Sequence, residues 1–155
     1  MRKSINICSP YFLPDRSLAA ELAHAAERGV AVTVLTPGKW NNHPIARLAS
    51  RRRYGGLLKA GVRIYEYQPA MIHAKVFVVD SLWSVTGSTN FDNRSFGLND
   101  EVNLAVLERG LAARLEADFA RDLAESRSIS LREWRHRPLG ERALAALGRL
   151  LDRQV

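Results

Sequence analysis

The first third of the chain alternates between strand-like and helix-like patterns, and this alternation most constrains the fold. Residues 4–9 carry β-branched side chains at alternate positions, which predicts a strand. Asp15 is a candidate N-cap for a helix over residues 16–28, where apolar positions recur at helical spacing. Residues 30–36 predict a second strand. A strand, a helix and a strand joined by short loops form a βαβ unit, so we expect a sheet with flanking helices.

The remaining pattern extends this arrangement. The further predicted elements are a basic helix at 44–59, strands at 62–67, 73–79, 83–88 and 102–107, and helices at 111–125 and 139–153. Gly55-Gly56 weakens the centre of the basic helix, and a tight turn is expected at Asp80-Ser81. We therefore predict an α/β fold of three layers, α/β/α, with a mixed, mostly parallel sheet. Residues 1–128 are expected to form one domain, with 129–155 as a basic helical extension packed on it.

The charge balance indicates the class of partner. The chain of 155 residues has 23 Lys+Arg against 16 Asp+Glu, a net charge of +7, which favours a polyanion: nucleic acid, an anionic membrane surface or a phosphorylated substrate. The only cysteine, Cys8, lies in an apolar run, which excludes an internal disulfide and a sulfur metal site. No apolar stretch approaches the ~20 residues that span a bilayer, and residues 1–9 are too short for a signal peptide. We expect a soluble chain, at most peripheral on a membrane.

One motif brings several potentially catalytic side chains together. His73, Lys75 and Asp80 read HxKxxxxD and are followed by Gly87-Ser88-x-Asn90, and the other three histidines have no lysine two residues later. Residues two apart on a strand point to the same face, so the imidazole and the ammonium are expected to be neighbours. Asp80 has the wrong spacing for that face, and we interpret it as a turn and packing residue.

The motif predicts a phosphate site. Ser88 and Asn90 would share a face if their strand continues through residue 90, and a bound phosphate would then meet a cation, a hydroxyl and an amide. Such donors stabilise the charge that develops in phosphoryl transfer. Since Lys75 supplies positive charge and no His/Asp/Glu cluster has metal-ligand spacing, we expect neither a metal ion nor a cofactor.

His73 can act as a nucleophile, through a phosphoryl-enzyme intermediate, or as a general acid for the leaving alcohol. Both roles need the ring held in one tautomer by a carboxylate. Glu101 is the candidate, and Asp100 competes with it.

With these residues the sequence resembles the phospholipase D superfamily. The positions that match its HKD signature are His73, Lys75, Asp80, Gly87, Ser88 and Asn90, with Glu101 at the family's position for the carboxylate that orients the histidine. The wider sequence resembles the second half of bacterial cardiolipin synthases. The runs that carry this are SPYFLPD at 9–15, RGVAVTVLTPG at 28–38, AGVRIYEYQPAMIHAKVFVVD at 60–80, GSTNFDNRSFGLNDEVNL at 87–104 and LREWRHRPLGERALAALGRLL at 131–151.

The resemblance implies a phospholipase D-like catalytic half-domain at 1–128 and phosphodiester transfer through a phosphohistidine. The implied substrate is an anionic phospholipid such as phosphatidylglycerol, whose phosphatidyl group passes to an alcohol or to water, in a cytoplasmic enzyme peripheral on the cytoplasmic membrane. The implied catalytic residues are His73, Lys75, Ser88, Asn90 and Glu101, with Asp80 and Gly87 in support.

The single motif copy is a departure from these relatives, which carry two copies that meet across a pseudo-twofold axis. The second HKD half would come from a homodimer mate, as in the single-copy nucleases of the superfamily, or from an N-terminal half that is missing, which we favour. In a lone second half His73 would be the general acid, and in a homodimer it would serve both roles.

Two alternatives remain open. A homodimeric nuclease of the same superfamily would use the net charge against nucleic acid. A non-catalytic half-enzyme would only bind phosphate or membrane. For the lipid enzyme, the basic helix at 44–59 and the segment around Trp134 are candidate membrane contacts.

Overall fold

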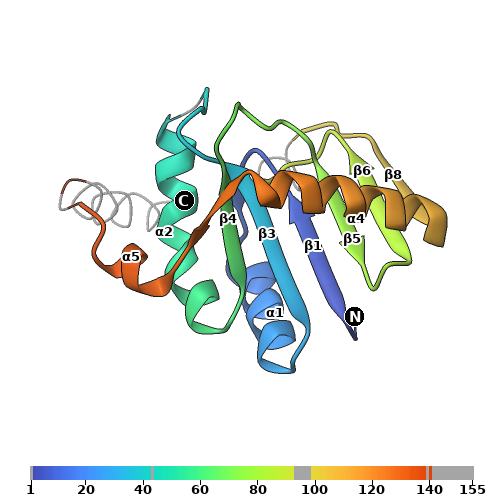
Figure 1. Cartoon of the computed structure of the whole chain (residues 1–155), viewed down its shortest axis with the longest axis horizontal. Helices are drawn as coiled ribbons and strands as arrows, with labels where there is room; N and C mark the ends of the chain where they lie inside the picture. The colour runs from blue at the N-terminus through green and yellow to red at the C-terminus, as the bar shows by residue number, and fades with distance from the viewer. Residues whose placement is uncertain (1, 43, 93–98, 139, 141–155) are drawn as a thin grey trace.

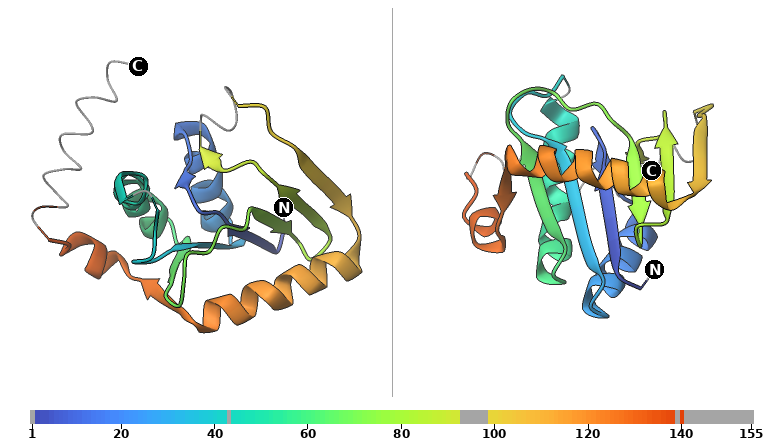
Figure 2. Two further views of the ribbon diagram at one scale, coloured as in Figure 1. Left: turned by 90° about the horizontal axis from the view of Figure 1, so that it is seen from above. Right: turned by 45° about the vertical axis from the view of Figure 1, so that its right-hand side comes forward.

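The computed structural model describes residues 2–42, 44–92, 99–138 and 140, and they form three layers around one sheet. Helix α4 (Arg109–Ala124) crosses one face of the sheet, while α1 (Arg16–Glu27) and α2 (Pro44–Lys59) lie on the other (Figures 1 and 2). The main sheet has the order β8-β6-β5-β1-β3-β4-β9. Its strands are β1 (Ser4–Cys8), β3 (Ala31–Pro37), β4 (Arg63–Tyr67), β5 (Val76–Val79), β6 (Trp83–Gly87), β8 (Asn103–Leu107) and β9 (Ser126–Ile129). The predicted three-layer α/β class is confirmed.

Parallel pairing is confined to the middle of the sheet. β1 pairs in parallel with β3, and β3 with β4, as the helices between them require. The pairs β1–β5, β5–β6, β6–β8 and β4–β9 are all antiparallel. The sheet is mixed as predicted, but within it only β1, β3 and β4 pair in parallel, so it is not mostly parallel. A short turn joins β5 to β6, whereas α4 connects β8 to β9 across one face of the sheet, from one edge to the other.

The first βαβ unit forms as its sequence predicts. Asp15 accepts a hydrogen bond from the Leu18 N–H at 2.7 Å and caps α1. Leu22 and Ala25 of that helix are buried in the main core beside Val32 and Val34 of β3. β3 is buried along most of its length because it is a central strand with helices on both faces.

Several boundaries differ from the prediction. The strand expected at 73–79 begins only at Val76, so the motif histidine and lysine precede it. β9 and the short helix α5 (Leu131–Arg135) were not predicted, although Ser130 and Glu133 form a capping box at the start of α5. The helix expected at 139–153 lies, except for residue 140, outside the described residues.

Helix α2 is continuous through its two glycines. A Cβ on Gly55 would lie 2.3 Å from the ring of Trp134, so the glycine makes room for that indole. The indole N–H of Trp134 donates to the Arg51 carbonyl at 2.6 Å. Trp134, a candidate membrane contact from sequence, is instead packed on α2.

The β5–β6 turn anchors the start of the chain. Asp80 and Ser81 have φ values of 54° and 53°, and the Leu82 N–H donates to the Val79 carbonyl at 3.1 Å, in a three-residue loop between the paired Val79 and Trp83. The Asp80 carboxylate accepts backbone hydrogen bonds from Arg2, Lys3 and Ser4 at 2.7–3.1 Å. Burial raises the pKa of Asp80, but these N–H donors outweigh it and lower that pKa to about 2. The turn lies at the end of β5 opposite to Lys75.

Replacing Asp80 with asparagine is expected to weaken this anchor at neutral pH. A carboxyl whose pKa is lowered on folding contributes stability above its ordinary value of 3.8, and loses it as the pH falls through about 2. We expect Asp80→Asn to lower the free energy of unfolding by about 1 kcal/mol at pH 7, because solvent screens part of the interaction. Urea unfolding at pH 7, 4 and 2 would test this, and a difference that persists at pH 2 would contradict it.

Candidate active site

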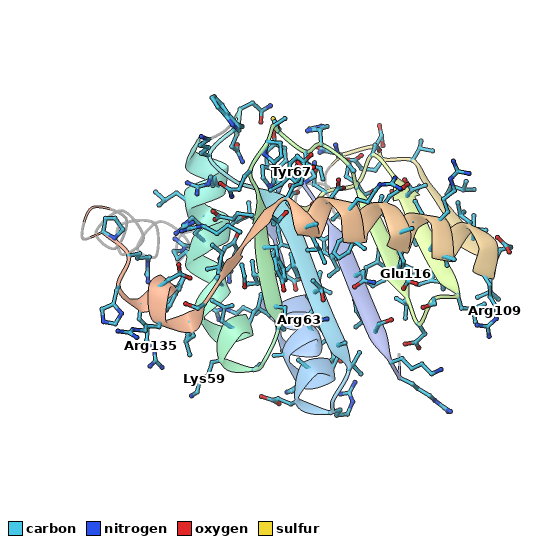
Figure 3. The ribbon with its side chains drawn as sticks, in the orientation of Figure 1. Lys59, Arg63, Tyr67, Arg109, Glu116 and Arg135 are labelled. Carbon is cyan, nitrogen blue, oxygen red and sulfur yellow. The ribbon has the colours of Figure 1, made fainter. Side chains whose placement is uncertain are left out.

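Apart from Asp80, the motif residues lie at the carboxyl edge of the parallel strands, where open α/β sheets bind ligands. β5 and β8 begin at this edge and β6 ends there, since each runs antiparallel to its neighbour. It is the upper edge of Figure 3, where Tyr67 marks the end of β4. The sheet therefore brings three segments distant in sequence to one place.

His73 lies three residues before β5 and is exposed. The Lys75 ammonium donates to the His73 carbonyl at 3.1 Å. Partial burial, and then the charge of Lys75, lower the pKa of His73 below its ordinary value of 6.5. This shift favours the neutral imidazole, the form that a nucleophile requires.

Lys75 lies in the centre of the cluster. Its carbonyl accepts from the Gly87 N–H at 3.4 Å, which joins the start of β5 to the end of β6. Burial lowers the pKa of Lys75, while the nearby Glu101 carboxylate acts in the opposite direction. A partly desolvated ammonium is a strong donor to a phosphate oxygen.

The side chains of Ser88 and Glu101 are hydrogen-bonded to each other. The Ser88 hydroxyl donates to the Glu101 carboxylate and accepts from the Val102 N–H at 3.0 Å. The Asn99 amide also donates to Glu101, at 3.4 Å. A Cβ on Gly87 would lie 2.2 Å from the Val102 carbonyl, so only glycine permits the close approach that holds these residues together.

Asn90 is placed by a loop and not by a strand. β6 ends at Gly87, so the strand does not continue through residue 90, and the condition under which Ser88 and Asn90 would share a face is not met. The Asn90 carbonyl accepts from the Asp92 N–H at 2.9 Å, at the entry to β7 (Phe91–Asp92). β7 pairs in parallel with β2 (Phe12–Leu13), which ties this loop to the segment after β1.

The structure thus brings together Lys75, Gly87, Ser88 and Glu101, with His73 beside the lysine. Asp80 does not join them, because it lies at the opposite end of β5.

Residues outside the motif also reach the site. The Tyr11 ring packs edge-on against the His73 imidazole, with centroids 6.2 Å apart. Asn103 donates to the Thr89 hydroxyl at 2.5 Å and links β8 to the loop after β6. Tyr11 belongs to the SPYFLPD run, which the sequence singled out only as a resemblance.

An apolar cavity of about 350 Å³ adjoins the site. Lys75, Thr89 and Asn103 contribute to its lining, and the apolar lining residues are Leu18, Val76, Phe77, Trp83, Val85 and Phe91.

Within the described residues, no three His, Cys, Asp or Glu side chains are grouped so that they could hold a metal ion. Burial raises the pKa of the Cys8 thiol to about 12, consistent with a core residue. Over the same part of the chain, no helix has the length and apolar character needed to cross a membrane.

The family described as "Cardiolipin synthase, PLD-like domain" matches residues 1–123. The chain belongs to this family. The resemblance inferred from the motif is thereby confirmed.

Curated members of the family extend well beyond this segment. A cardiolipin synthase from Geobacillus sp. (strain WCH70) is 40% identical over 97% of the chain and 30% of its own length. A cardiolipin synthase 2 from Bacillus anthracis is 41% identical over 97% of the chain and 29% of its length. A minor cardiolipin synthase from Bacillus subtilis (strain 168) is 32% identical, with 38% of its length covered. The chain spans about a third of the length of the curated relatives it matches.

Solved structures share the fold. The phospholipase D family member Nuc from Salmonella typhimurium superposes with a TM-score of 0.72 at 21% identity, over 83% of each chain. Phosphatidylserine synthase from Haemophilus influenzae Rd KW20 gives 0.73 at 21% identity, over 97% of this chain and 39% of that one.

Proposed function

We propose that this chain carries one half of a two-histidine site that transfers a phosphatidyl group on anionic phospholipid, as a cardiolipin synthase-like phosphatidyltransferase or phospholipase D. The observation that carries the proposal is the cluster of Lys75, Ser88 and Glu101 beside His73 at the carboxyl edge of the sheet. The names of the curated relatives support the lipid substrate.

In the proposed reaction a ring nitrogen attacks the phosphorus of the diester. The bond from phosphorus to the leaving glycerol oxygen breaks, and the second histidine of the pair protonates that oxygen. An alcohol or water then attacks the phosphohistidine and gives its proton to the same histidine, now acting as a base. His73 takes one of these two roles, and its lowered pKa supports the nucleophile in the unliganded chain.

The remaining side chains act on charge and orientation. Lys75 neutralises the non-bridging phosphate oxygens, with Ser88 and the Asn90 amide as further donors. Each such donor is typically worth about 3 kcal/mol in a dry site. Glu101 is proposed to orient an imidazole, and its hydrogen bond to Ser88 holds its carboxylate near Lys75.

The second histidine half is proposed to come from a second copy of this chain or from another segment that carries an HKD motif. Light scattering would separate a dimer from a monomer. A monomer that cleaves no phosphodiester until a segment with another HKD motif is added would favour that segment as the source of the second histidine.

Peripheral contact with an anionic membrane is part of the proposal. Trp40 is 53% exposed in the loop that follows β3 at the carboxyl edge, with the Lys39 ammonium 5.0 Å from its ring centroid. An exposed indole beside a lysine is typical of a membrane interface.

A second candidate is a homodimeric nuclease, favoured by the net charge of +7. The deciding experiment offers the protein phosphatidylglycerol vesicles and, separately, plasmid. We expect release of glycerol or formation of a diphosphatidyl product, lost in His73→Ala. Nicked plasmid with unchanged lipid would reject the lipid enzyme in favour of the nuclease.

A further inference from the structure

Tyr11 makes a contact to His73 that the motif does not include. It lies in the loop between β1 and β2, and its ring stands at 84° to the imidazole with centroids 6.2 Å apart. This is the edge-to-face arrangement that aromatic rings prefer. The Tyr11 hydroxyl donates to Asn42 Oδ1 at 2.8 Å, in the loop after β3. The tyrosine therefore bridges the histidine to a third loop of the same edge.

Hydrogen bonds also hold the backbone of Tyr11 in place. The hydroxyl of Ser9, which is fully buried, donates to the Tyr11 carbonyl at 3.0 Å and accepts from the Phe91 N–H at 3.3 Å. The next residue, Phe12, begins β2 and pairs with Phe91 of β7. Phe91 directly follows Asn90. Tyr11 is thus tied through its main chain to the loop that carries the motif asparagine.

His73 needs such a restraint because it does not lie on a strand. The structure assigns no regular element to residues 71–75, so the strand ladder that begins at Val76 does not fix the imidazole. Displacing a reacting atom by about 1 Å can cost roughly a hundredfold in rate. A rigid ring held at two points is a suitable support.

We propose that Tyr11 is a positioning residue of the phosphodiester-transfer site, whose ring holds the His73 imidazole in register with the Asn90 loop and whose hydroxyl bond to Asn42 fixes that ring. The inference rests on the proposed function of His73. Tyr11 acts through the histidine and takes no part in bond making.

The electrostatics agree with this contact. Burial is the main cause of the lowered pKa of His73, and the Tyr11 ring is one of the groups that contact its imidazole. Removing the ring admits water and is expected to raise the pKa of His73 toward its ordinary value.

The first test is a titration of the His73 imidazole followed by NMR, which needs no activity. Tyr11→Leu removes the ring, Tyr11→Phe removes only the hydroxyl, and Asn42→Ala removes its acceptor. The His73→Ala spectrum assigns the resonance. We expect Tyr11→Leu to raise the His73 pKa and shift its ring signals, and Tyr11→Phe to leave the pKa nearly unchanged. A His73 titration and chemical shifts that are the same in all variants would overturn the proposal.

The second test is kinetic and uses a two-by-two cycle. We expect Tyr11→Leu to lower kcat about 10- to 100-fold with little change in KM, and Tyr11→Phe to recover most of that loss. Tyr11→Phe, Asn42→Ala and the double variant should lose the same amount, since all three break one hydrogen bond. Additive losses, or a rise in KM alone, would instead assign Tyr11 to substrate contact and overturn the positioning role.

The two tests separate this inference from the proposed function. If His73→Ala keeps full activity, the proposed function fails, whatever the titration shows. If His73→Ala is inactive while Tyr11→Leu changes neither the titration nor kcat, only the positioning role fails. Should Tyr11→Leu not fold, the Tyr11→Phe and Asn42→Ala cycle decides by itself.

Discussion

Replacing His73 with alanine is expected to lower the rate of phosphatidyl transfer at least about 10⁴-fold, because it removes a nucleophile or a general acid that no neighbouring group replaces. A phosphatidyl adduct, trapped by rapid alkaline quench and seen by intact mass, is expected only when the histidine acts as the nucleophile. The matched control is His24→Ala. His24 is an exposed histidine on α1 with a distant Glu21 partner at 4.0 Å, and its removal should leave the rate unchanged.

Mixing wild-type and His73→Ala chains extends this prediction. If two copies supply one histidine each, only the wild-type pair is fully active, and an equal mixture should retain about a quarter of the activity. If another segment supplies the second histidine, activity falls only in proportion to the wild-type fraction. In that case a chimera, with this chain in place of the matching segment of the Geobacillus relative, is the active form to assay. Full activity of His73→Ala in either form would refute the proposed chemistry.

The elements of the fold that follow from local pattern were predictable. The βαβ unit carries its own signals: β-branched strands, the Asp15 cap, and helical spacing up to Gly29, which adopts φ of 89°. Helix 44–59 was found at its predicted bounds. The glycine pair within it looked like a weakness because the reason for Gly55 lies some eighty residues away, in the ring of Trp134.

The short elements were not predictable for a related reason. β2 and β7 have two residues each and exist because they pair with one another, so neither has a pattern of its own. β9 has the sequence SRSI, whose one buried residue, Ile129, gives no alternation to detect. Long-range pairing selects such segments, and sequence periodicity does not report it.

The site, like the fold, was predictable only in part. The chemistry of the motif was readable because its residue types and spacing are specific. Its geometry was not, because the sequence pattern predicts His73 on a strand that in fact begins three residues later. The Tyr11 contact depends on a loop sixty residues upstream, and no spacing rule connects the two.

Glu66 presents the largest expected effect on stability. Its side chain is 2% exposed on β4 and accepts hydrogen bonds from Arg47, at 3.0 Å, and from Arg51. Removing one partner of a buried ion pair typically costs 3–5 kcal/mol, because the remaining charge stays buried without compensation. We expect Glu66→Gln to destabilise the fold by about 3 kcal/mol and to lower the melting temperature by roughly 10 °C.

Arg127 provides the matched control for this prediction. It approaches the same carboxylate at 3.8 Å, but its side chain is 52% exposed. We expect Arg127→Gln to cost less than about 1 kcal/mol, as surface pairs do. Calorimetry and urea unfolding of both variants would measure the difference, and equal losses would show that burial does not set the strength of this pair.

The ion pairs of Glu66 reduce the number of positive charges that the chain can offer to a polyanion. Arg47 and Arg51 belong to the basic helix that the sequence offered to a membrane or a nucleic acid, yet their guanidinium groups face the buried Glu66. They contribute to the fold and are not available to bind a phosphate. Replacing Glu66 and Arg51 together with leucine should therefore recover part of the stability lost in Glu66→Gln without weakening vesicle binding. A loss of vesicle binding in that double variant would show instead that the Arg51 charge acts on the lipid.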